Sequence, residues 1–132
     1  MSFLLGYNKP MDIISRVNLR VDDMVLAHKV FTEALGFSGN LNKTIVTYKM
    51  ENHSEVHIYH DPEIFRESPT HVNLTVSPEK VAKSAQILKE SGVKYVIYHE
   101  NVGEGIINTL EWGMEDGSSL RLESFEDSYW TR

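Results

Sequence analysis

The stretch THVNLTVSP, residues 70–78, decides the fold because the chain has already carried nearly the same stretch, SRVNLRVDD, at residues 15–23. Each copy alternates apolar and polar side chains, which is the period of a half-buried β-strand. Each copy ends in short polar side chains that can cap a helix, Asp22-Asp23 in the first and Ser77 in the second. The repeat therefore predicts two modules that both open with a strand followed by a helix.

The segments that follow the two copies also match. Apolar residues at helical spacing continue to Gly36 after the first copy and to Gly92 after the second, and a glycine after the last turn is typical of a helix end. Beyond each glycine the apolar period changes to two. The strands expected there are 43–50 and 55–60, with 37–41 as a further candidate, and then 94–99, 106–114 and 118–125. The chain thus reads as β-α-β-β-β twice.

One such module covers only part of its apolar surface with its single helix. Pairing two modules leaves the helices outside curved mixed sheets that enclose a concave cavity. The fold class expected is therefore α+β with two tandem βαβββ modules. We expect one domain over residues 1–132, with module one at about 11–62, module two at about 69–126, and residues 1–10 as an extension.

The alternation assigns each strand residue to one of two faces. The helix-covered core is expected to hold Val17, Leu19, Val21, Val56, Ile58, Val72, Leu74, Val76, Leu120 and Leu122. The opposite, concave face is expected to hold Arg16, Asn18, Arg20, Glu55, His57, Tyr59, His71, Asn73, Thr75, Ser119, Arg121 and Glu123. This second set is unusually polar for strands at the centre of a small domain.

Composition excludes several classes of protein. A formal charge of −6 argues against nucleic acid as a partner, because a binder of the phosphate backbone needs a clustered basic surface. The chain has no cysteine, which removes disulfides and thiolate chemistry and fits a cytoplasmic location. The N-terminal MSFLLGY has only a short apolar run and no preceding basic region, so we expect neither a signal peptide nor a membrane span.

Three motifs follow one another along the duplicated modules, namely HVNLTV at 71–76, LKESGVK at 88–94 and EDGSSLRLESF at 115–125. In this order, they resemble the vicinal oxygen chelate superfamily, which includes glyoxalase I, the bleomycin- and fosfomycin-resistance proteins and the extradiol dioxygenases. The resemblance covers nearly the whole chain from about residue 13 to 125. It implies the paired-module fold, and, together with the aromatic tail SYWTR at 128–132, it predicts a homodimer.

In metal-using members of that superfamily, the first and last strands of each module supply His and Glu ligands to a divalent ion. The resemblance places those four positions at Arg16, His57, His71 and Arg121, which we call the four mapped positions. Arginine has five donors, no acceptor and a permanent charge, so it cannot bind a cation. Two imidazoles alone make a weak site, and we therefore expect no metal cofactor. If a divalent metal is present, it would use His57, His71 and Glu123.

Two guanidinium groups where relatives hold a cation favour an anion instead. We expect the cavity to bind a small organic anion, as in the bleomycin-resistance group, without assured catalysis. The ligand-binding residues would be Arg16, Asn18, His57, His71, Asn73, Arg121 and Glu123.

Other interpretations stay open at this point. The arginines could pair internally with Glu111 or Glu123. The protein could be a metal-dependent lyase, isomerase or dioxygenase, or an enzyme with a histidine as general base, or a regulatory module that has lost the pocket. The ligand, any reaction, and the formation of the cavity within one chain or across two are not set by the sequence.

The remaining histidines and the large aromatic residues have simpler expected roles. The histidines at 28, 53, 60 and 99 are expected on the surface. Tyr48 and Trp112 could line the cavity, but we expect them in the core.

Overall fold

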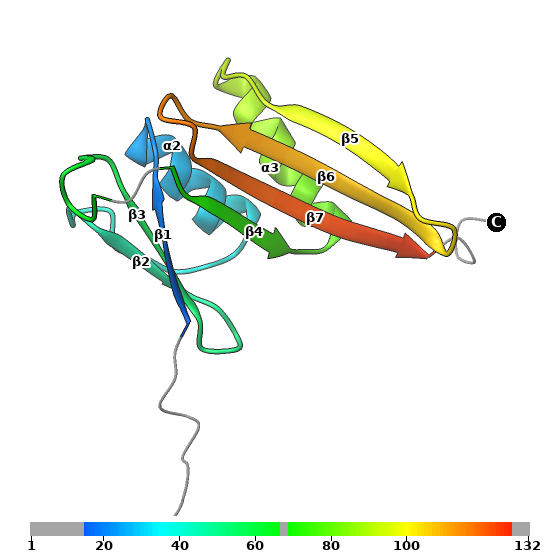
Figure 1. The fold of residues 1–132 in the computed structure, drawn as a ribbon, viewed down its shortest axis with the longest axis horizontal. Helices are drawn as coiled ribbons and strands as arrows, with labels where there is room; N and C mark the ends of the chain where they lie inside the picture. Colours follow the sequence, from blue (N-terminus) through cyan, green and yellow to red (C-terminus); the bar gives the residue numbers. More distant parts are fainter. Residues whose placement is uncertain (1–14, 67–68, 128–132) are drawn as a thin grey trace, which may run out of the picture.

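The computed structural model describes residues 15–66 and 69–127. Its elements are β1 (Arg16–Arg20), α2 (Met24–Lys29), the π-helix η2 (Val30–Ala34), β2 (Val46–Lys49), β3 (Glu55–Tyr59), β4 (His71–Thr75), α3 (Pro78–Glu90), β5 (Val96–Asn101), β6 (Gly105–Gly113) and β7 (Ser119–Asp127) (Figure 1). The expected extension at 1–10 and the tail SYWTR lie outside the described residues. The α+β class and the strand-then-helix opening of both modules are confirmed.

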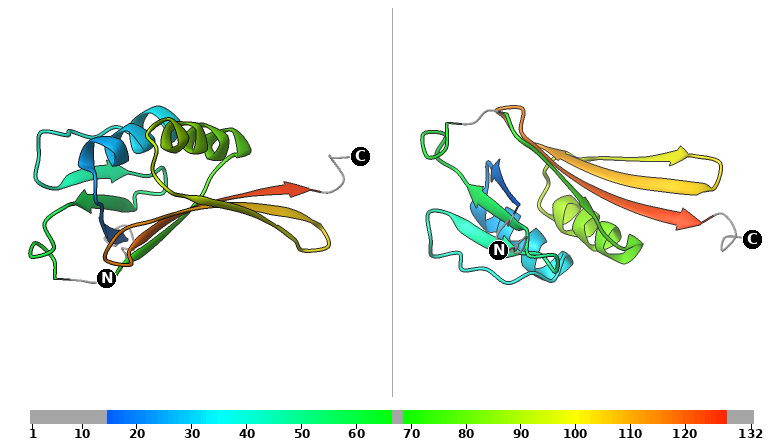
Figure 2. Two further views of the ribbon diagram at one scale, coloured as in Figure 1. Left: turned by 90° about the horizontal axis from the view of Figure 1, so that it is seen from above. Right: turned by 60° about the horizontal axis from the view of Figure 1, so that its bottom comes forward.

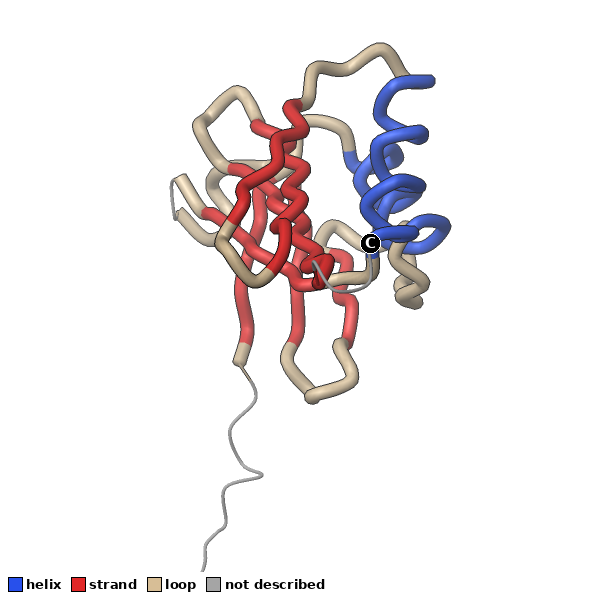
Figure 3. Tube along the Cα trace, turned by 90° about the vertical axis from the view of Figure 1, so that its right-hand side faces the viewer, coloured by secondary structure: helices blue, strands red, loops and turns tan. Residues whose placement is uncertain are grey.

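Each module builds one sheet, with strand order β1-β3-β2 in the first and β4-β7-β6-β5 in the second. In both sheets the first strand of the module pairs in parallel with its last strand, β1 with β3 and β4 with β7. The helices lie together on one side of the strands (Figure 3), and the second sheet extends beyond α3 (Figure 2). The two modules therefore present their other faces on the side away from the helices.

The helix boundaries form as the residue types predict. Asp23 caps α2 by accepting a hydrogen bond from the Leu26 amide at 3.0 Å, and Ser77 caps α3 by accepting one from the Lys80 amide at 3.4 Å. Gly36 follows the first helix with a φ of 81°, a conformation that costs other residues strain. Within the described residues, no helix has both the length and the apolar character needed to cross a membrane.

One apolar cluster contains residues of both modules. Leu19, Phe31 and Ile58 of the first module and Leu88 and Leu122 of the second are fully buried in it. Tyr48 and Trp112 also belong to this cluster, which confirms the prediction that they are core residues.

Three residues assigned to the core are less covered than their alternation predicts. Val17 is 43% exposed, so its assignment to the core was wrong, and Leu74 and Val76 are only half-buried. All three side chains lie on the predicted face of their strands. They are less buried because they line the space where the two modules meet, which other side chains do not fill. The apolar pattern therefore identified the face correctly and the depth of burial incorrectly.

The candidate strand at 37–41 is wrong, because this segment is a loop and the first sheet has three strands. Asn40 forms a local turn there, since its side chain accepts from the Asn42 amide at 2.9 Å. Gly39 packs against the buried Tyr48 ring so closely that an added Cβ would lie 2.6 Å from Cε1. These local contacts replace the strand ladder that the pattern suggested.

His28 is not a surface residue as expected, because its ring is half-buried against Tyr48. Its Nδ1 lies 2.7 Å from the Tyr48 hydroxyl. Burial raises the pKa of that hydroxyl above its usual range, so the phenol keeps its proton. The other three histidines are exposed, as predicted.

A charged junction connects the end of β1 with the β6–β7 turn. The Asp22 carboxylate accepts from the Arg20 guanidinium at 2.7 Å and from the Glu115 amide at 3.0 Å. Asp116 lies 3.8 Å from the same guanidinium. This junction joins module one to module two.

The Tyr48 hydroxyl generates a prediction about alkaline stability. A raised pKa in the folded state gives stability that is complete below the unfolded value near 10 and is lost as the pH rises above it. Tyr48→Phe should lower the free energy of unfolding by about 1 kcal/mol at neutral pH, because the hydrogen bond to His28 is lost. This difference from the wild type should shrink above about pH 10. Urea denaturation between pH 7 and 11 measures it, and a difference that stays constant to pH 11 would contradict the assignment.

Candidate functional site

Part of the expected concave face is covered in the first sheet. Asn18 is opposite His57 in the parallel β1–β3 pair, and Asn18 is buried. Tyr59 is fully buried, and the Phe65 ring packs against it edge-on at 4.9 Å. The expectation that Tyr59 lies on an open polar face was therefore wrong, because residues after β3 fold back over it. Arg16 is exposed at the other end of β1.

His57 uses both nitrogens of its ring. Nε2 lies 3.0 Å from the Glu55 carboxylate, two residues earlier on the same face of β3. Nδ1 lies 3.4 Å from the Thr47 hydroxyl on β2. Both contacts orient the ring along the sheet, and a metal would have to replace one of them.

The second sheet carries its polar residues in ordered rows. His71 is opposite Ser119 and its Nδ1 lies 2.9 Å from the Ser119 hydroxyl. Asn73 is opposite Arg121 in the β4–β7 pair, and Thr75 is opposite Glu123. His71, Asn73, Arg121 and Glu123 thus share one face, as the alternation predicts.

Arg121 is held by an acidic neighbour on β6. Its Nη2 lies 3.3 Å from Glu111 Oε1, and the Tyr98 hydroxyl lies 3.4 Å from the same carboxylate oxygen. Three neighbours raise the pKa of Arg121. The largest cause is the negative charge of ionised Tyr98, the next are the hydrogen bond and charge of Glu111, and the smallest of the three is the charge of Glu123. Internal pairing with Glu111, one of the interpretations left open by the sequence, is therefore present. It uses one donor of the guanidinium and leaves others for a ligand.

The donor set does not fit the metal site of the superfamily. Among residues 15–66 and 69–127, no group of three or more His, Asp or Glu side chains could hold a metal ion. In the same residues, none of the four mapped side chains forms a hydrogen bond with another of the four. Within the described residues, His57, His71 and Glu123 thus do not form a metal site.

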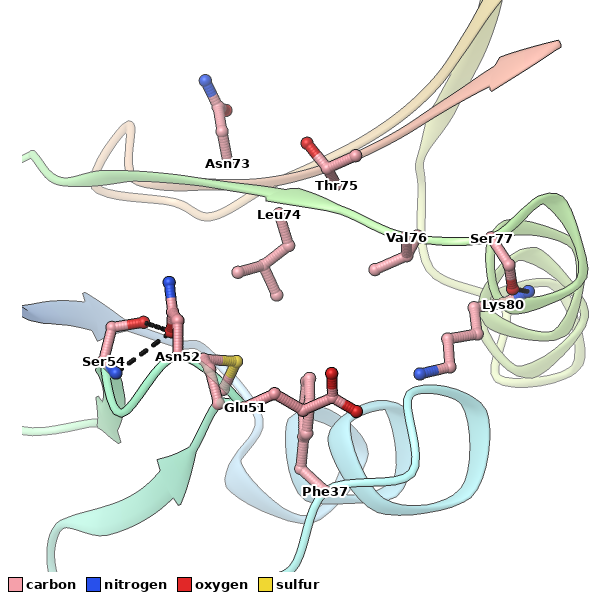
Figure 4. A pocket seen from close by; sticks show the side chains of 11 residues that line it. Phe37, Glu51, Asn52, Ser54, Asn73, Leu74, Thr75, Val76, Ser77 and Lys80 are labelled. Atoms are coloured by element: carbon pink, nitrogen blue, oxygen red, sulfur yellow. Dashed lines mark hydrogen bonds between the residues drawn. The ribbon is translucent and has the colours of Figure 1, made fainter.

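The structure instead forms a pocket between the modules, which we call the seam pocket. It has a volume of about 670 Å³ and lies between β4, the end of β2 and the start of α3 (Figure 4). Residues important for its chemistry are Phe37, Met50, Glu51, Leu74, Val76 and Lys80. A smaller space of about 190 Å³, lined by Val17, His71 and Asn73 among others, lies by the start of β1.

These pockets contain few of the residues expected to bind a ligand. Asn73 lines both pockets and His71 the smaller one, whereas Arg16, Asn18, His57, Arg121 and Glu123 line neither. Sequence reasoning missed Phe37, Met50 and Lys80, which come from a loop, a strand end and a helix. No shared periodicity relates them, so no local signal could have grouped them.

Comparison with protein families gives one partial match. The model of the carboxypeptidase activation peptide family matches residues 47–109, which is less than half of the chain. That range begins in β2 and ends in β6, so it includes part of each module. No curated protein matches the chain by sequence.

Comparison with solved structures gives matches over nearly the whole chain. A lactoylglutathione lyase from Agrobacterium tumefaciens is similar with a TM-score of 0.55 and 14% identity, covering 88% of this chain and 96% of that one. A glyoxalase/bleomycin resistance protein/dioxygenase from Alicyclobacillus acidocaldarius matches with a TM-score of 0.54 and 13% identity, covering 92% and 97%. A glyoxalase/dioxygenase from Nostoc punctiforme matches with a TM-score of 0.55 and 13% identity, covering 94% and 99%.

The paired modules, the parallel first and last strands and these matches define one fold. The chain has the fold of the vicinal oxygen chelate superfamily, and the resemblance stated from the sequence is confirmed at the level of the fold. At identities of 13–14%, these similarities carry no information on the reaction or the ligand.

The four mapped positions can be tested by rebuilding the metal site. The double variant Arg16→His/Arg121→Glu should bind Zn²⁺ at least about tenfold more tightly than the wild type, because it supplies two ligands in place of two cations. Isothermal titration calorimetry measures the affinity. Adding His71→Ala to the double variant should remove the gain. Equal Zn²⁺ affinity in the wild type and the double variant would show that these positions do not converge.

Proposed function

We propose that the protein binds a small organic anion on the polar face of its sheets and does so without a metal cofactor. The observation that carries this proposal is the presence of arginine at two of the four positions that hold metal ligands in related folds. Arginine repels a cation and donates paired hydrogen bonds to carboxylate or phosphate groups.

The neighbours of the two arginines support an anion over a metal. Arg16 is exposed at the start of β1, where its guanidinium can reach a ligand. Glu111 accepts a hydrogen bond from Arg121 and orients its guanidinium, which retains donors that Glu111 does not use. His57 is held by Glu55 and Thr47, so its role is to shape the site.

Calorimetry with matched probes tests the proposal. Phenylacetate should bind at least about tenfold more tightly than its neutral amide, phenylacetamide, because only the anion forms charge-assisted hydrogen bonds. The double variant Arg16→Gln/Arg121→Gln should lose this preference. The control Lys83→Gln/Lys89→Gln, which removes two positive charges from exposed positions on α3, should keep it.

Two results would contradict an anion site at the arginines. One is equal binding of phenylacetate and phenylacetamide by the wild type. The other is an equal loss of preference in the arginine variant and in the lysine control, which would indicate a general effect of net charge.

We also infer that the protein is a cytoplasmic homodimer. The absence of cysteine and the fold support this inference, as do the exposed apolar side chains Val96, Ile97 and Tyr98 along β5. Sedimentation equilibrium at micromolar concentration should give twice the 15.1 kDa chain mass. A monomeric mass would contradict the dimer and leave the anion site untouched.

A further inference from the structure

We propose that the seam pocket is a second binding site, and that it takes a carboxylate attached to an aliphatic chain. This site lies on the opposite side of β4 from the polar face. In Figure 4, Leu74 and Val76 point from β4 into the pocket, whereas Asn73 and Thr75 point away from its interior. A ligand in the seam pocket would therefore not contact Arg121, which is opposite Asn73 on the far face.

One wall of the seam pocket is apolar and incompletely covered. Phe37, Met50, Leu74 and Val76 all pack against the core and all remain half-buried. They come from a loop, the end of β2 and the end of β4, so they meet only because the two modules dock. Apolar surface left in contact with water favours an occupant that covers it.

The size of the seam pocket suits a small molecule. Its volume of about 670 Å³ lies within the range of sites that hold cofactors and metabolites. Its lining combines four apolar side chains with seven polar residues, of which Asn73 and Thr75 point away from the interior. An aliphatic chain of moderate length fits both the volume and the character of the wall.

Lys80 provides the positive end of the site. It lies in the first turn of α3, and its Nζ is 5.6 Å from the centre of the Phe37 ring. This cation–π contact holds the ammonium at the edge of the apolar wall while preserving its charge. In Figure 4 the ammonium and the Glu51 carboxylate both point into the pocket. A carboxylate on the ligand would bind Lys80. Glu51 would repel a second negative charge on the ligand from the other side of the pocket.

Methyl NMR with octanoate as the probe tests this site. Met50 lines the pocket, whereas Met114 is buried in the core away from it. In protein labelled at the methionine methyl groups, octanoate should shift the Met50 signal saturably and leave the Met114 signal in place. Octanol, which has the same chain without the charge, should need about a tenfold higher concentration for the same shift.

Matched variants separate the seam pocket from the polar face. Lys80→Gln should weaken octanoate binding about tenfold, to the level of octanol. Lys83→Gln, an exposed lysine on the same helix, and Arg121→Gln on the polar face should leave the octanoate-induced shift of Met50 unchanged. Failure of octanoate to move Met50, or equal losses in Lys80→Gln and Lys83→Gln, would overturn the seam-pocket site. A loss in Arg121→Gln alone would overturn it too, and would assign the carboxylate to the anion site on the other face.

Discussion

Parallel pairing of the first and last strands of each module is the constraint on which the structure depends. It sets Leu19 beside Ile58 in one module and Leu74 beside Leu122 in the other. Because side chains alternate along a strand, a shift of one residue would turn these side chains away from the helices and bring Arg121 toward the core. A parallel pair also requires a crossover, and the helix in each module supplies it on the same side. The polar face and the helix-covered face both follow from this one pairing.

Much of the fold could be predicted because its determinants are local. The caps at Asp23 and Ser77 and the glycine after each helix act within a few residues, and the alternation in β4 and β7 acts within single strands. The loop at 37–41 escaped prediction because Asn40 and the tight packing of Gly39 on Tyr48 outweighed its weak strand pattern. His28 escaped because its partner Tyr48 is distant in sequence.

The residue types of the candidate site could be predicted from the sequence, but their arrangement could be predicted only in part. The pairing of Arg121 with Glu111 was foreseeable, since the tight turn at Gly117 brings these residues side by side on adjacent antiparallel strands. The convergence of the two modules was not foreseeable. It involves contacts between residues distant in sequence, such as the Asp22 carboxylate with the Glu115 amide, and the apolar cluster that both modules share. The seam pocket exists because of that docking, so no single segment of the sequence carries its signal.

The edge position of β5 has a consequence for how the molecule opens. β7 is bonded to a strand on each side and holds the fully buried Leu120 and Leu122, whereas β5 has one neighbour and six exposed residues. Amide protons should therefore exchange with solvent fastest along β5 and slowest along β7. Local unfolding of the second sheet that starts along β5 would begin at the edge opposite β4, the strand shared by both proposed sites.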